Sequence, residues 1–135
     1  MDNLTPQQRR KTMQRVRSTD TAPELLVRRT LHRLGYRFRL HRKDLPGCPD
    51  IVFPGRKKLI FVHGCFWHRH EGCPDASMPA SRLEYWKAKF NRTVERDTRA
   101  VQELQEAGWA TLVIWTCELK DRAELERRLL AFLEG

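Results

Sequence analysis

The chain has 135 residues, which fits one domain, and hydrophobic residues make up 40% of it. Lys and Arg number 26 against 17 Asp and Glu, and the net charge of +9 favours an anionic partner, nucleic acid first, over a merely basic surface. There is no apolar run of about 18 residues and no signal-like start, so we expect no membrane role and a cytoplasmic location.

Two helices and three strands are predicted in the first half of the chain. A polar, strongly basic helix is expected over residues 5–18. Thr21-Ala22-Pro23-Glu24 has the form of a capping box with an early proline, and it predicts a helix that runs to Gly35. The apolar stripe expected on that helix consists of Leu25, Leu26, Leu31 and Leu34. Strands are expected over 36–41, over 50–53 before a turn at Pro54-Gly55, and over 59–63, which is apolar enough to be central.

The second half begins with residues 64–79, which are rich in Cys, His, Gly and Pro and predict an irregular segment. A long helix is expected from about 81 to 107, closed by Gly108, and then an apolar strand over 109–116, buried on both faces. Asp121-Arg122-Ala123-Glu124 predicts the start of a last helix. This order predicts one α/β domain over 1–135, with a mixed central sheet flanked by helices.

Four cysteines, Cys48, Cys65, Cys73 and Cys117, favour metal binding or chemistry over disulfides, because no secretory signal is present. Cys65, His70 and Cys73 have the spacing C-x4-H-x2-C, and Cys117 could complete a tetrahedral structural zinc site from the end of the last strand. The metal would order a loop that has little apolar content. His68 competes with His70 for the third position, and reduced thiols in a packed loop are the alternative.

Two histidines, His63 and His68, remain if zinc takes the other four residues. They could stand behind the zinc ligands or lie on the surface as readily as take part in catalysis. Pro49-Asp50 opens a strand, and His63 closes the next one. This pattern resembles the PD-(D/E)xK nucleases, in which the aspartate binds magnesium, although Phe61 and His63 stand where those enzymes have an acid and a lysine. The pattern is weak when taken alone.

The run His63-Gly64-Cys65-Phe66-Trp67-His68 resembles the central motif of one family, the very-short-patch mismatch-repair endonucleases (Vsr), which have a restriction-endonuclease-like fold. The similarity covers about residues 8–133. It extends to Asp20-Thr21-Ala22, Glu24, Leu45-Pro46-Gly47, Pro49-Asp50, Glu84-Tyr85-Trp86, Val94-Glu95-Arg96-Asp97 and Gly108-Trp109.

The resemblance implies roles for individual residues. Catalytic magnesium would be bound by Asp50, Glu24 and the backbone carbonyl of Val62. His63 would take part in the hydrated metal cluster, and His68 would activate the attacking water. Zinc would be held by Cys65, His70, Cys73 and Cys117. DNA would be contacted by the basic segment 1–18, with Met13 in the minor groove, and by Phe66, Trp67, Trp86 and Lys89, the aromatic ones as a wedge beside the mismatch.

The resemblance also implies a monomeric nickase that cuts duplex DNA 5′ to the thymine of a T·G mismatch. Its functional partners would be a DNA cytosine methyltransferase and the mismatch-repair proteins. A restriction-type nuclease with another target is the first alternative, favoured by departures from the family pattern at Cys48 and Thr93. A non-enzymatic zinc DNA-binding module is the second, and it would leave Asp50 and Glu24 without a task.

Overall fold

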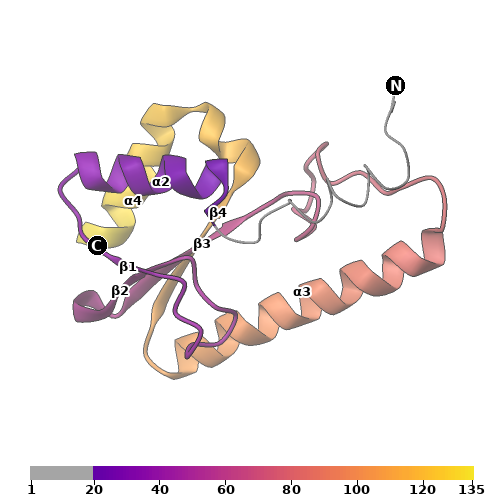
Figure 1. Ribbon diagram of the computed structural model, residues 1–135, viewed down its shortest axis with the longest axis horizontal. Coiled ribbons are helices and arrows are strands. Elements are labelled where there is room, and N and C mark those ends of the chain that lie inside the picture. Colours follow the sequence, from indigo (N-terminus) through magenta and orange to yellow (C-terminus); the bar gives the residue numbers. More distant parts are fainter. Residues whose placement is uncertain (1–19) are drawn as a thin grey trace.

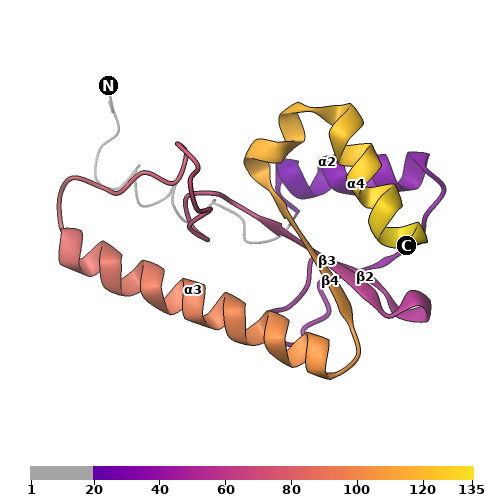
Figure 2. The same ribbon diagram turned by 180° about the vertical axis from the view of Figure 1, so that it is seen from behind.

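The computed structural model describes residues 20–135, so the helix predicted over 5–18, with Met13, lies outside the described residues. At the centre is a mixed sheet of β1 (Arg39–Leu40), β2 (Ile51–Phe53), β3 (Lys58–His63) and β4 (Ala110–Trp115), in that spatial order. Helices α2 (Ala22–Arg33) and α4 (Arg122–Glu134) lie on one side of the sheet, and α3 (Leu83–Glu106) lies on the other (Figures 1 and 2). The mixed α/β architecture is confirmed.

The direction of the strands brings three chain segments together at one end of the strands. β3 pairs in parallel with β4, from Lys58 opposite Ala110 to His63 opposite Trp115, so both strands end on the same side. β2 is antiparallel to β3, with Ile51 opposite Ile60, and therefore begins on that side. The residues before β2, after β3 and after β4 consequently meet there.

Two apolar layers hold the helices to the sheet. Ile60 faces the α2–α4 side and packs with Val27, Leu31, Ile114 and the buried leucines of α4. Its neighbours Leu59 and Phe61 point to the opposite face, towards Leu104 of α3 and Trp109. This alternation with a period of two is that of a strand covered on both faces, and β3 is the central strand that the sequence predicts.

The predicted helix ends are set by local hydrogen bonds. Thr21 Oγ1 accepts from the Glu24 amide at 3.4 Å at the start of α2, and Asp121 Oδ1 accepts from the Glu124 amide at 3.1 Å at the start of α4. Gly108, with φ +92°, lies just beyond α3, where the Trp109 amide donates to the Leu104 carbonyl at 2.9 Å. These caps confirm the helix starts and stops that the sequence predicts.

Three local predictions are corrected. Both faces of β4 pack against an apolar layer, through Leu112 and Ile114 on one and Val113 on the other, but only Ile114 is fully buried, so the expectation of two buried faces is met only in part. The strand expected over 36–41 is reduced to Arg39–Leu40, both exposed at one edge of the sheet. Of the leucine stripe predicted on α2, Leu31 is fully buried and Leu26 is partly buried against the core. The rest of the buried face consists of Glu24, Val27 and Thr30, because the helix turns Glu24 towards the ends of the strands.

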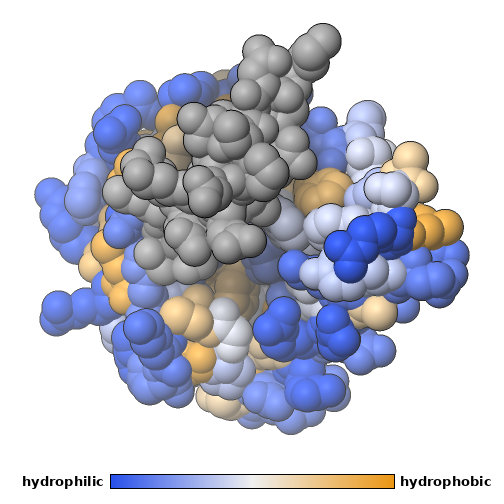
Figure 3. Space-filling model, turned by 45° about the vertical axis from the view of Figure 1, so that its right-hand side comes forward, coloured by the Kyte–Doolittle hydropathy of each residue, from blue (hydrophilic) through white to orange (hydrophobic). Residues whose placement is uncertain are grey.

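The outer surface is predominantly hydrophilic on the face drawn in Figure 3, with smaller apolar areas between the charged side chains. Within residues 20–135, no helix combines the length and the apolar composition that crossing a membrane requires.

Candidate active site and metal centre

A cavity of about 700 Å³ opens where the strand ends converge. Its walls come from α2, the turn before β2, the end of β3, the loop that follows it, α3 and the residue after β4. The polar side chains that line it include Glu24, His41, Asp50, His63, His68, Asp97 and Thr116. Sheet topology therefore gathers side chains that lie far apart in the sequence.

Asp50 is fixed at the cavity by the strand beside it. Its Oδ2 accepts a hydrogen bond from the Val62 amide at 2.7 Å. Burial raises the pKa of Asp50 to about 7; the Val62 amide opposes this, and the negative charge of Glu24 adds to it. Glu24 itself is only 3% exposed. A divalent cation beside these two carboxyls would relieve their shared charge, and hard oxygen ligands suit magnesium, so the residues fit such an ion.

His68 and Asp97 form a pair that joins the loop after β3 to α3. His68 Nδ1 lies 2.7 Å from Asp97 Oδ2. An ionised carboxylate only accepts, so Nδ1 carries the proton in this pair, and neutral His68 keeps an unprotonated Nε2. The arrangement is that of a general base oriented by an acid.

His63 lies beneath His68, with the two imidazole rings stacked at 3.9 Å between centroids and 4° between planes. It is 7% exposed and also contacts Phe61 and Trp115. Burial lowers the pKa of His63 to about 4, helped by the neighbouring His68 and opposed by Asp97. His63 is therefore neutral near physiological pH and can support His68 without repelling its protonated form.

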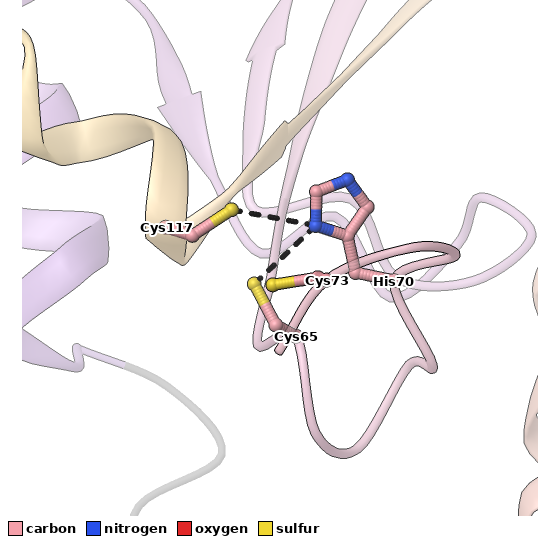
Figure 4. A group of neighbouring side chains, drawn as sticks. All are labelled: Cys65, His70, Cys73 and Cys117. Atoms are coloured by element: carbon pink, nitrogen blue, oxygen red, sulfur yellow. Dashed lines mark hydrogen bonds between the residues drawn. The ribbon is translucent and has the colours of Figure 1, made fainter. Parts of the chain in front are cut away.

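A second cluster of ligand-type side chains lies next to the cavity. Cys65, His70 and Cys73 come from the loop after β3, and Cys117 comes from the 3₁₀ helix Thr116–Lys120 that follows β4 (Figure 4). Their ligand atoms lie within 4.8 Å of one another. His70 Nδ1 is 3.6 Å from Cys65 Sγ and 3.4 Å from Cys117 Sγ, whereas His68 groups with His63 and Asp97.

These four residues fit a tetrahedral zinc ion. A nitrogen and a sulfur ligand of one tetrahedral zinc are roughly 3.6 Å apart, given the usual bond lengths. Burial raises the pKa of Cys117 to about 12, and the adjacent thiols add to the effect. Burial also opposes ionisation of Cys65, but a hydrogen bond with Thr116 and contacts with Cys117 lower its pKa to about 7. A bound cation would offset the cost of holding the Cys65 and Cys117 sulfurs ionised side by side.

Aromatic side chains lie between the loop and the start of α3. Phe66 packs edge-on against Trp67, Trp86 and Phe90. Trp67 is 39% exposed, and Lys89 Nζ lies 5.3 Å above its ring and 5.6 Å above that of Trp86. Of the residues expected to contact DNA, the four that lie within residues 20–135 thus form one patch beside the cavity: Phe66, Trp67, Trp86 and Lys89.

Sequence reasoning gave no role to several residues that organise the site. Asp97 stood in a family-like motif without a function, and His41 and Arg28, both at Glu24, were not singled out. Arg69 packs its guanidinium 4.0 Å from the Phe90 ring and donates to the carbonyls of Phe66, Ala76 and Ser77. The contacts of Asp97 and His41 depend on how separate segments are placed, which the sequence does not show, whereas the i,i+4 spacing of Glu24 and Arg28 is a local signal for their contact.

Comparison with known proteins gives several matches. The family described as DNA mismatch endonuclease Vsr matches residues 1–75. The type II nicking enzyme V.XorIIP of Xanthomonas oryzae pv. oryzae is 54% identical over 98% of this chain and 97% of its own length. The type II nicking enzyme V.NmeAIP of Neisseria meningitidis is 38% identical over 95% of this chain and 91% of its own. The DNA mismatch endonuclease Vsr of Escherichia coli is 42% identical over 87% of this chain and 74% of its own length.

Proposed function

Because this chain belongs to the Vsr family of DNA mismatch endonucleases, we propose that it nicks one strand of duplex DNA 5′ to the thymine of a T·G mismatch and so starts very short patch repair. The observation that carries the proposal is the cavity, which holds three carboxyl side chains and three histidines beside an exposed tryptophan. The restriction-endonuclease-like fold expected from the sequence agrees with this placement at the edge of a mixed sheet.

The proposed chemistry is phosphodiester hydrolysis with magnesium, which would be held by Asp50 and Glu24 with the carbonyl of Val62. Magnesium, when bound, supplies positive charge at the scissile phosphate and favours ionisation of water. His68, held through Nδ1 by Asp97, takes the proton of the attacking water on Nε2. His63 remains neutral and keeps the His68 ring in place by stacking.

Zinc has a structural role in this proposal. Cys65, His70, Cys73 and Cys117 would hold it and so tie the loop after β3 to the segment after β4. His68 lies in that loop between Cys65 and His70, so the metal would fix the position of the general base. A closed site of four protein ligands leaves no position for a substrate.

DNA recognition is assigned to the aromatic patch. Trp67, with Phe66 and Trp86, would enter the base stack, and Lys89 would meet the mispaired bases. Unstacking costs least where pairing is already defective, which gives a physical basis for mismatch preference. We expect the protein to act as a monomer in the cytoplasm, alongside a DNA cytosine methyltransferase and the mismatch-repair proteins.

A restriction-type nuclease with a different target is the second candidate. It is favoured by two positions that depart from the family pattern expected from the sequence: Cys48, which lines the cavity, and Thr93 on α3. Such an enzyme would cut fully paired DNA. The relatives named nicking enzymes support cleavage of one strand in either case.

The deciding experiment compares nicking of three otherwise identical duplexes, one with T·G, one with another mismatch and one fully paired, with magnesium present. The proposal expects one cut, mapped 5′ to the thymine, in the T·G duplex only. Asp50→Ala should abolish cutting but keep mismatch binding, because the aromatic patch is untouched. Equal cutting of the paired duplex would favour the restriction-type candidate, and binding without cutting of any duplex would favour a non-enzymatic zinc module.

A further inference from the structure

Glu24 is held at the cavity by an unusual concentration of donors on one of its two oxygens. Oε2 accepts from the Asp20 amide, from Arg28 Nη2 and from His41 Nε2, each at 3.0 Å. An oxygen with three donors has no accepting capacity left for a ligand. Oε1 is therefore the oxygen that can serve the cavity.

Arg28 occupies the centre of this cluster. Its Nη2 lies 2.8 Å from Asp20 Oδ1, 3.0 Å from Glu24 Oε2 and 3.2 Å from His41 Nε2. Asp20, Glu24 and His41 are spaced closely enough to bind a metal ion, but the guanidinium already supplies the positive charge among them. We therefore interpret the cluster as an ion-pair network and not as a further metal site.

The two hydrogens of Arg28 Nη2 are both used by carboxylates, one by Asp20 and one by Glu24. Nη2 has none left for the imidazole of His41, so His41 Nε2 carries a hydrogen itself and donates it to Glu24. The His41 amide donates in turn to the Asp50 carbonyl at 3.3 Å. His41 thus connects the backbone of Asp50 with the side chain of Glu24.

We propose that Arg28 and His41 are positioning residues that clamp Oε2 of Glu24 and thereby present Oε1 to the cavity beside Asp50. The inference rests on the proposed function, because it gives Glu24 a place in binding the catalytic cation. Without the clamp, the Glu24 side chain would sample several rotamers and would be less often placed for the ion. Arg28 and His41 do not themselves contact the ion or DNA in this proposal.

The first test removes the clamp while keeping apolar volume. Arg28→Met and His41→Leu should each lower the single-turnover nicking rate about tenfold or more, and should weaken Mn²⁺ binding to the free protein, measured by calorimetry, to a similar degree. His41→Gln, which keeps a donor near the position of Nε2, should stay within about threefold of wild type in both measurements. Arg33→Met is the matched control, because Arg33 is on α2 but is 64% exposed and pairs with Glu126.

The second test separates positioning from mere stabilisation. If Arg28 acts through Glu24, Arg28→Met should cause no further loss of nicking when it is added to Glu24→Gln, whereas independent effects would multiply. Circular dichroism and zinc content should match wild type in every variant compared. If Arg28→Met does not fold, the pair His41→Leu and His41→Gln decides the question.

The outcomes separate the two proposals. Wild-type nicking and Mn²⁺ affinity in Arg28→Met and His41→Leu, with a slow Glu24→Gln, would overturn the clamp and leave the proposed function standing. Multiplicative losses in the double variant would also overturn it. A wild-type protein that nicks no duplex would overturn both.

Discussion

Asp97, on α3, accepts a hydrogen bond from Nδ1 of His68, in the loop after β3, over 2.7 Å. The contact links two segments that are 29 residues apart in the chain and fixes which nitrogen of His68 faces the cavity.

Asp97→Asn should slow nicking, on the order of 10²-fold, because an amide can donate to Nδ1 and so leave the proton on Nε2, the nitrogen that must accept one. Single-turnover nicking of the T·G duplex checks this. Binding of that duplex should be unchanged. Glu103→Gln, an exposed acid farther along α3, is the control. An unaltered rate in Asp97→Asn would mean that His68 does not act as the base through Nε2.

Cys117→Ser should release zinc and lower the free energy of unfolding by several kcal/mol, because one of four ligands to a closed structural site is lost. Elemental analysis and thermal unfolding are the measurements. Cys48→Ser is the matched control, since Cys48 is a cysteine outside the cluster and should keep both metal and stability. Wild-type protein that carries no metal and is fully active would contradict the assignment.

Asp50→Asn should make the metal-free protein more stable at pH 8, although it abolishes nicking. The pKa of Asp50 is raised in the folded state to about 7, so the folded protein holds a proton that the unfolded chain releases near pH 4. That contribution to stability is fully present below about pH 4, falls progressively as the pH rises, and is lost once the pH has passed about 7. Asparagine cannot ionise, so the variant should keep it, a difference on the order of 1–3 kcal/mol.

Thermal unfolding in chelator between pH 5 and pH 8 measures this difference. Wild type should fall below Asp50→Asn as the pH rises, and magnesium should restore stability to wild type alone. Parallel pH curves for the two proteins would show that Asp50 is not the titrating group.

Trp67→Ala should lose much of the preference for the T·G duplex over the paired one while keeping its zinc. Stacking on an aromatic ring contributes roughly 1–3 kcal/mol per base, so the loss should be about 5- to 150-fold. Tyr85→Ala is the control, because Tyr85 is a 45% exposed aromatic residue that contacts Trp86 but is not among the residues expected to enter the base stack. Full discrimination by Trp67→Ala would remove the wedge from the mechanism but leave the nuclease in place.

Gly47→Ala should destabilise the fold by about 1–3 kcal/mol through backbone strain and crowding. Gly47 has φ +74°, and an added Cβ would lie 2.8 Å from the Ala100 Cβ and 3.2 Å from the Phe61 ring. Denaturant unfolding measures the loss. Gly72→Ala has a similar φ but open space around it, so comparing the two isolates the steric part.

The sequence predicts best what is local. The spacing of Cys65, His70 and Cys73 lies within one loop, and Thr21 and Asp121 cap helices that begin at their own positions. His68 and His70 could not be told apart by spacing, because in an irregular loop their directions depend on backbone turns. The structure separates them by placing His70 with the cysteines and His68 with Asp97.

Most of the residues without a predicted role depend on tertiary placement. His41 reaches Glu24 from outside α2 because the helix turns Glu24 inward, whereas Arg28 and Glu24 form an i,i+4 pair on α2 that their spacing could have indicated. An apolar run such as 109–116 does not show whether a strand will have one neighbour or two, and β4 proves to be the edge strand of the described sheet.

The parallel pairing of β3 and β4 has a consequence for how activity could be lost. The four thiolate and imidazole ligands come from the segments that leave these two strands, and His68 lies along the chain between two of those ligands. If the cluster holds zinc as proposed, oxidation of its sulfurs would release the loop and displace the base in the same event. An oxidised molecule would then fail to cut DNA at all and would not become a nuclease that cuts without discrimination.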